Sequence, residues 1–178
     1  MTTTTFIPAP RRWLQVLAGR YAVQAVAVIG VGAAAALAIH LGHPHPHAPD
    51  LALLRRQPPV VLAHLATALF AFGLGTVMMV APKGTLPHRT LGWIWVALMM
   101  TVAGSSLFIH GINKNGFSAI HILSAWVLFI VPVAVFSARR HNVRMHRRAM
   151  MGTFYLGLII AGAFTFMPGR LMWNLFLG

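Results

Sequence analysis

The chain has 178 residues, of which 58% are hydrophobic and only 8% are charged, and its formal net charge is +13. A soluble domain carries roughly a quarter charged residues, so this composition predicts an integral membrane protein. Asp50 is the single acidic residue, and cysteine is absent, which excludes disulfides, iron–sulfur clusters and covalently attached c-type haem. Lys and Arg lie in short turns between apolar runs and form no basic stripe with interleaved aromatic residues, so we expect no nucleic-acid partner.

The amino-terminal part predicts a tail, one span and a polar loop. Residues 1–20 are polar and basic and are expected to form a cytoplasmic tail. Arg11 and Arg12 weakly resemble a twin-arginine export signal, but a positive flank on an uncleaved helix is the favoured interpretation. The first transmembrane helix is predicted over 21–41, and residues 42–59 form an outer loop rich in His and Pro.

Four more apolar runs follow, and they predict a four-helix membrane core over residues 60–167. The runs cover about 60–81, 88–110, 118–138 and 146–167, with Gly- and Pro-containing turns or charged turns between them. Pro132 is expected to kink its helix without breaking it. Residues 168–178 form an outer carboxyl-terminal tail. The predicted fold is therefore all-α, with five transmembrane helices, and spans two to five form an antiparallel bundle.

The distribution of basic residues predicts the orientation. With the amino terminus inside, the tail contributes three arginines, the second-to-third turn contributes Lys83 and Arg89, and the turn between spans four and five contributes five arginines. The outer side then holds only Arg55, Arg56, Lys114 and Arg170. Because basic residues favour the cytoplasmic side, we expect the amino terminus inside and the carboxyl terminus outside, in a bacterial inner membrane.

Four histidines stand near the starts of the last four spans. His64 and His121 begin spans that run inward, so they share a depth near the outer face, whereas His88 and His146 share a depth near the inner face. Two neutral imidazoles at matched depth on facing helices are what a b-type haem requires. Small residues such as Ala68, Ala71 and Gly75 follow His64 on its face, which would suit a flat macrocycle or plain helix packing. Snorkelling or capping is the structural alternative for each histidine.

Several segments resemble known membrane proteins. The segments LAHLATALFAFGLG, KGTLPHRTLGWIWV, FSAIHILSAWVLF and MHRRAMMGTFYLGL resemble the core helices of the ascorbate-reducible transmembrane cytochromes b. The whole sequence looks even more like a family of predicted bacterial multi-pass membrane proteins that share PHRTLGWIW, FSAIHILS and MHRRAMMG. The resemblance to the cytochromes implies transmembrane electron transfer with one or two b-haems and a quinol or ascorbate-like reductant. It implies two ligand pairs, His64 with His121 and His88 with His146, and propionate or anion contacts from Lys83, Arg144, Arg147 and Arg148.

Two other functions stay open. The chain could be a cofactor-free subunit or assembly partner of a larger complex or homo-oligomer, with structural histidines. It could also handle metal, since His43, His45 and His47 alternate with prolines in the outer loop and could bind copper or zinc. His110 could be an alternative outer haem ligand, but an interface residue is the favoured interpretation. Proton-pump chemistry is not expected, because no carboxylate lies within a predicted span.

Overall fold

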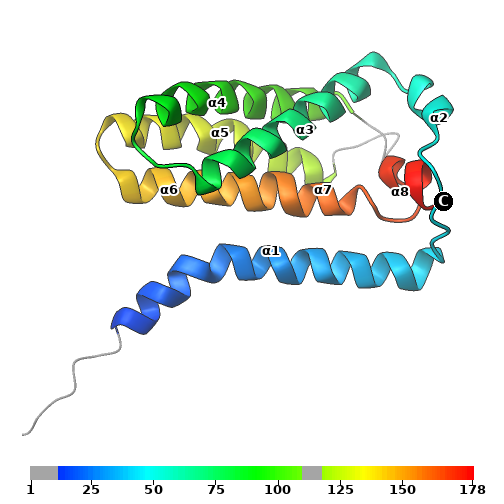
Figure 1. The fold of residues 1–178 in the computed structure, drawn as a ribbon, viewed down its shortest axis with the longest axis horizontal. Helices are drawn as coiled ribbons and strands as arrows, with labels where there is room; N and C mark the ends of the chain where they lie inside the picture. Colours follow the sequence, from blue (N-terminus) through cyan, green and yellow to red (C-terminus); the bar gives the residue numbers. More distant parts are fainter. Residues whose placement is uncertain (1–11, 110–117) are drawn as a thin grey trace, which may run out of the picture.

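The computed structural model describes residues 12–109 and 118–178, and these residues are almost entirely helical, with no strand among them (Figure 1). Two helices precede the bundle: α1 (Arg12–Gly42) and the short α2 (Leu51–Arg55). The bundle contains α3 (Pro59–Val80), α4 (Leu86–Ser106), α5 (Ala119–Arg139), and the consecutive segments α6 (Val143–Gly152), η1 (Thr153–Ile160) and α7 (Ala161–Phe164). A last helix, α8, covers Leu171–Phe176. The all-α prediction is thus confirmed for the described residues.

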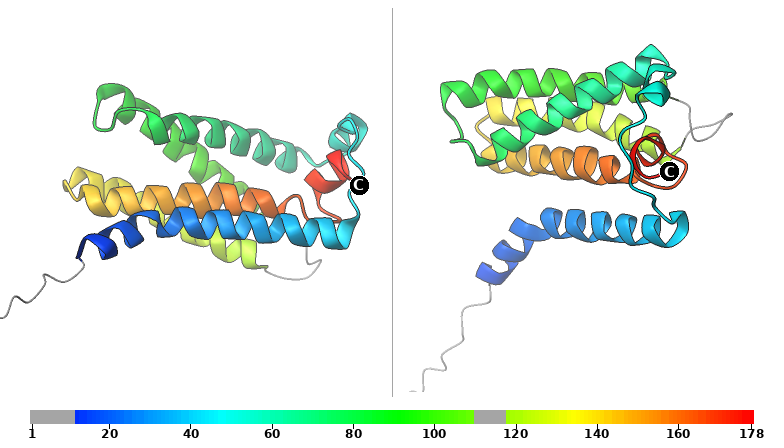
Figure 2. Two further views of the ribbon diagram at one scale, coloured as in Figure 1. Left: turned by 60° about the horizontal axis from the view of Figure 1, so that its bottom comes forward. Right: turned by 45° about the vertical axis from the view of Figure 1, so that its right-hand side comes forward.

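The four-helix bundle is built from α3, α4, α5 and the run α6–η1–α7. Each member packs on the next along the chain, and contacts between α3 and η1 close the bundle (Figure 1). The π-helical η1 therefore contacts two bundle helices and α1 at once. Helix α1 lies outside the bundle, alongside η1 and α7 (Figure 2).

Local sequence explains where the bundle helices begin. Pro59 opens α3 at a position where its missing N–H costs no hydrogen bond. The Thr85 side chain caps α4 by accepting from the amide of His88 at 3.3 Å. The Asn142 side chain caps α6 by accepting from the amide of Met145 at 3.1 Å. Between α3 and α4 the chain turns at Gly84, whose φ of 79° suits a residue without a side chain.

The bundle core is apolar and closely packed. Met99 on α4, Val131 on α5 and Thr153 on η1 are its largest fully buried side chains. The Thr153 hydroxyl donates to the Ala149 carbonyl at 2.9 Å, which satisfies its polar atom inside the bundle. Many large apolar side chains on the helices are exposed, among them Val28, Phe70 and Phe129, as expected when lipid covers the outer surface.

Three helical segments are long and apolar enough to cross a membrane: Tyr21–Gly42, Pro59–Val80 and Ile120–Arg139. Five spans are therefore not confirmed. Helix α4 has a suitable length, but it carries His88 and Arg89 in its first turn and two serines at its end. The final run is divided into α6, η1 and α7, none of which is long enough by itself.

Three predicted boundaries differ from the observed ones. Helix α1 begins at Arg12, so residues 12–20 of the predicted tail are helical. The predicted outer loop contains α2, which Asp50 caps by accepting from the amides of Ala52 and Leu53. The predicted carboxyl-terminal tail contains α8. Arg11, His110 and Lys114 lie outside the described residues.

Candidate functional site

The two ends of the bundle differ in charge. We call one the arginine end; it carries the α3–α4 and α5–α6 turns and the basic residues Lys83, Arg89, Arg139, Arg140, Arg144, Arg147 and Arg148. We call the other the loop end; it carries residues 43–58 and α8 (Figure 1). Asp50, the single acidic residue of the chain, lies at the loop end, where it caps α2.

The arginine end brings His88 and His146 together. His88 is in the first turn of α4 and His146 in the first turn of α6, and both His146 and Lys83 are close enough to His88 to interact with it electrostatically. The His146 Nδ1 atom lies 3.0 Å from the Ala134 carbonyl oxygen on α5. A carbonyl can only accept, so Nδ1 carries the hydrogen and the neutral ring keeps its lone pair on Nε2. This arrangement is typical of metal-ligating histidines, whose second nitrogen donates to a carbonyl.

His88 contributes an unusual atom to this end. Its Nδ1 is buried and has no hydrogen-bond partner among the residues that the structure describes. A buried polar atom without a partner costs free energy, on the order of 1–3 kcal/mol, unless a ligand or water completes it. The donor set at the arginine end is therefore suited to a metal centre with imidazole ligands.

At the loop end, His64 has the same tautomer as His146, with the hydrogen on Nδ1. Its Nδ1 lies 2.9 Å from the Ser105 hydroxyl on α4. That hydroxyl donates its single hydrogen to the Thr101 carbonyl at 2.7 Å, so it accepts from the ring. The neutral His64 ring therefore also has its lone pair on Nε2.

His121, the predicted partner of His64, is in the opposite state. It is buried in the first turn of α5, and its Nδ1 accepts from the backbone amide of Ser118 at 3.1 Å. An amide N–H can only donate, so the Nδ1 lone pair is occupied and the hydrogen of a neutral ring is on Nε2. The Ser118 side chain completes a capping box with His121. In this conformation His121 serves to begin the helix and does not offer a lone pair on Nε2.

Hydrogen bonds nevertheless connect α4 with both α3 and α5 at the loop end. Ser106, next to Ser105, shares a hydrogen bond with Ser124 on α5, and Ser124 is three residues from His121. This contact links the His64 side of α4 to the His121 side of α5. His64 and His121 therefore lie near the same end of the bundle, which is consistent with the alternating directions of α3, α4 and α5.

Side chains fill the bundle interior further along α3 than His64. The indole of Trp95 donates to the Ala71 carbonyl at 2.9 Å, and a Cβ on Gly75 would meet Phe154 and Trp95 atoms at 2.6–2.7 Å. The small residues Ala71 and Gly75 therefore accommodate Trp95 and Phe154 and leave no room for a macrocycle in the middle of the bundle. Ala125, one turn after His121, is exposed and does not face the interior.

Of the four residues predicted to contact anions, the lysine is hydrogen-bonded within the chain and the three arginines are exposed. Lys83 donates to the Met79 and Ala81 carbonyls at 2.6 and 2.7 Å, so it caps the end of α3. Arg144, Arg147 and Arg148 are exposed on α6, and no hydrogen bond or ion pair engages them within the described part of the chain. These three arginines remain accessible to an anion outside the protein.

The His- and Pro-rich loop packs against the carboxyl-terminal segment. The amides of His45, His47 and Asp50 donate to the carbonyls of Leu177, Phe176 and Leu175. The His47 ring contacts the Ala48 and Gly178 carbonyl oxygens at 2.7 and 2.9 Å, so a metal ion would have to displace one of these contacts. No group of three or more His, Asp or Glu side chains is arranged to hold a metal within residues 12–109 and 118–178. Metal binding by His43, His45 and His47 stays a prediction.

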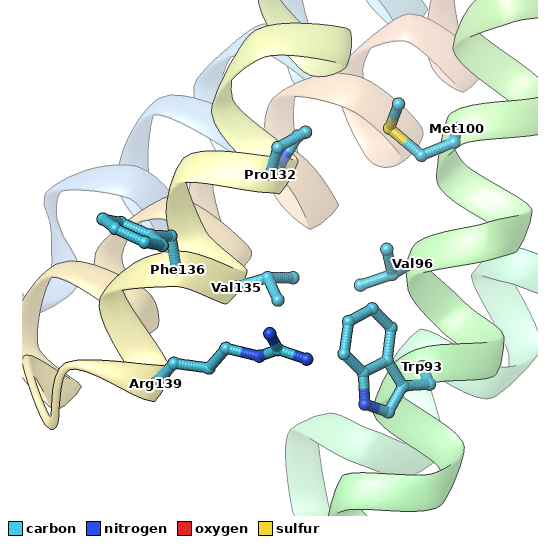
Figure 3. A pocket seen from close by; sticks show the side chains of 7 residues that line it. All are labelled: Trp93, Val96, Met100, Pro132, Val135, Phe136 and Arg139. Carbon is cyan, nitrogen blue, oxygen red and sulfur yellow. The ribbon is translucent and has the colours of Figure 1, made fainter.

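One groove opens on the side of the bundle, between α4 and α5, with a volume of about 390 Å³ (Figure 3). None of the four candidate ligands lines it; its lining residues are Trp93, Val96, Met100, Pro132, Val135, Phe136 and Arg139.

Comparisons with known proteins were made at three levels. No family model, no curated protein and no solved structure matches the chain. The candidate site therefore stands on its own geometry.

Sequence reasoning missed the partners of the histidines. The Ala134 carbonyl, the Ser105 hydroxyl and the Ser118 amide orient the rings, and no motif marks them. One signal was present for His121: a serine three residues before a polar side chain at a helix start is the pattern of a capping box.

Proposed function

We propose that the protein is a membrane-embedded electron carrier with a b-type haem between His88 and His146 at the arginine end. The observation that carries this proposal is the bond from His146 Nδ1 to the Ala134 carbonyl, next to a His88 whose buried Nδ1 has no partner among the described residues. Such a haem would supply reversible one-electron chemistry. The chain's own part is to fix the His146 tautomer and to surround the site with apolar side chains.

The proposal includes five spans in a bacterial inner membrane, with the amino terminus inside. Helix α4 and the run α6–η1–α7 pack between and beside α3 and α5 over similar lengths, which supports their crossing with them. The arginine end is then cytoplasmic, because it holds most of the Lys and Arg residues. The exposed arginines Arg144, Arg147 and Arg148 would attract an anionic reductant of the ascorbate type, or a quinol at the interface.

A second haem at the loop end has weaker support. His64 offers the required lone pair, but His121 would have to give up its bond from the Ser118 amide and turn its ring. The two-haem form would complete an electron path across the bilayer. The described conformation supports one haem site, and electron transfer would then start or end at the arginine end.

The test is to count haem in purified protein and in single variants. We expect about one haem per chain, lost in His88→Gln and in His146→Gln and retained in His121→Gln. His141→Asn is the matched control, because His141 is exposed in the neighbouring turn and its φ of 58° suits asparagine. A ratio of two, with loss in His64→Gln and His121→Gln, would show that the loop end also binds. Haem retained in both His88→Gln and His146→Gln would contradict the proposed site.

A cofactor-free subunit of a larger complex is the second candidate. Trp95 and Phe154 fill the space beside Ala71 and Gly75, and His121 already has a structural role as a cap. The first observation favours plain packing in the middle of the bundle, and the second favours a structural role for His121 at the loop end. A protein that remains colourless after expression with added haem would support this candidate over the first.

A further inference from the structure

The groove between α4 and α5 combines apolar walls with one positive charge at its end. Arg139 is the last residue of α5 and of the candidate span Ile120–Arg139, so it stands where that span ends. From Arg139 to Pro132 the groove extends about 10 Å along the helix, using the ordinary rise per residue. The walls beyond Arg139 are apolar, so polarity falls along the groove from one end to the other.

Arg139 has no anionic partner within residues 12–109 and 118–178. Its guanidinium lies 5.6 Å from the centre of the Trp93 ring, and no hydrogen bond or ion pair engages it among the described residues (Figure 3). The single acidic residue of the chain, Asp50, is at the other end of the bundle. Arg139 is exposed, so its guanidinium is accessible to an anion from outside the chain.

We propose that this groove binds one anionic phospholipid, with its phosphate at Arg139 and an acyl chain between α4 and α5. Arginine presents several donors to phosphate oxygens, which neutral apolar ligands would leave unused. Trp93 is half-exposed beside the guanidinium and suits the boundary between headgroups and acyl chains. Val96, Val135 and Met100 then contact the acyl chain (Figure 3). The site goes beyond electron transfer and does not depend on haem.

The test is native mass spectrometry of the full chain in detergent, with phosphatidylglycerol or phosphatidylcholine added at equal concentration. We expect phosphatidylglycerol to be retained several-fold more strongly, because both lipids offer a phosphate to Arg139 but the choline cation of phosphatidylcholine offsets its negative charge. Arg139→Gln should abolish the preference, and Arg139→Lys should restore part of it. Val135→Phe should reduce retention by filling the groove without changing the charge.

Arg144→Gln is the matched control, because it removes one arginine from the same end but outside the groove. We expect it to leave the preference unchanged. If Arg139→Gln and Arg144→Gln reduced the preference for phosphatidylglycerol equally, the lipid would be attracted to the basic surface in general. That result would overturn the proposed site. Equal retention of both lipids, or unchanged retention in Val135→Phe, would also overturn it. Thermal unfolding shows whether each variant is folded. If Arg139→Gln is unfolded, lipid retention by Arg139→Lys and Val135→Phe tests the proposed site instead. The measured quantity is lipid retention and not haem content. The lipid site can therefore be tested even if the purified protein contains no haem.

Discussion

His146 and His121 show how one hydrogen bond decides what an imidazole can do. Both are near the start of a helix, and both use Nδ1 for a hydrogen bond. His146 donates to a carbonyl and so presents the Nε2 lone pair, whereas His121 accepts from an amide and so does not. Sequence spacing predicted that both histidines would begin helices. It could not predict the tautomers, because the Ala134 carbonyl and the Ser118 amide that determine them belong to the backbone.

Gly75 is the position where close packing depends most clearly on one residue. A Cβ there would meet Phe154 and Trp95 at 2.6–2.7 Å, so we expect Gly75→Ala to lower the free energy of unfolding by about 1–3 kcal/mol. Thermal unfolding in detergent measures the change. Gly73→Ala is the control on the same helix, because its Cβ would meet nothing within 4 Å. If both variants were equally stable, the close approach of Trp95 and Phe154 would be wrong.

At the scale of elements, α8 holds residues 45–50 beside the end of α1. Trp173 is buried, and its ring lies so close to Gly42 that a Cβ there would clash with it. The sequence alone could not show this contact, because Gly42 and Trp173 are more than a hundred residues apart in the chain.

We expect Trp173→Ala to release α8 and with it the loop amides. The amides of His45, His47 and Asp50 donate to carbonyls that follow Trp173, so their hydrogen exchange should accelerate at least tenfold, which corresponds to about 1.4 kcal/mol of lost local stability. Asn174→Ala is the control, because Asn174 is exposed on the same helix. Unchanged exchange in Trp173→Ala would mean that the backbone bonds alone hold the loop.

For the whole molecule, the open question is how many helices cross the bilayer. Hydropathy marks α1, α3 and α5, whereas the packing of α4 and α6–η1–α7 within the same bundle favours five spans. The sequence predicted the bundle because four apolar runs of similar length follow one another. It could not show that Trp95 and Phe154 occupy the interior, since packing partners are not encoded in periodicity.

Because the chain has no cysteine, single cysteines can report the side on which each turn lies. With five spans, Arg144→Cys in α6 and Asn174→Cys in α8 should be labelled from opposite sides of the membrane. With only α1, α3 and α5 spanning, both cysteines would be on the same side. A membrane-impermeant maleimide applied to intact cells and to inverted vesicles distinguishes these outcomes.

The most direct test of the central claim is the visible spectrum of the purified full chain, oxidised and then reduced with dithionite. A b-type haem with two imidazole ligands at the arginine end predicts a sharp alpha band on reduction and about one haem per chain. A preparation without such a band, even after expression with added haem, would contradict electron transfer by His88 and His146.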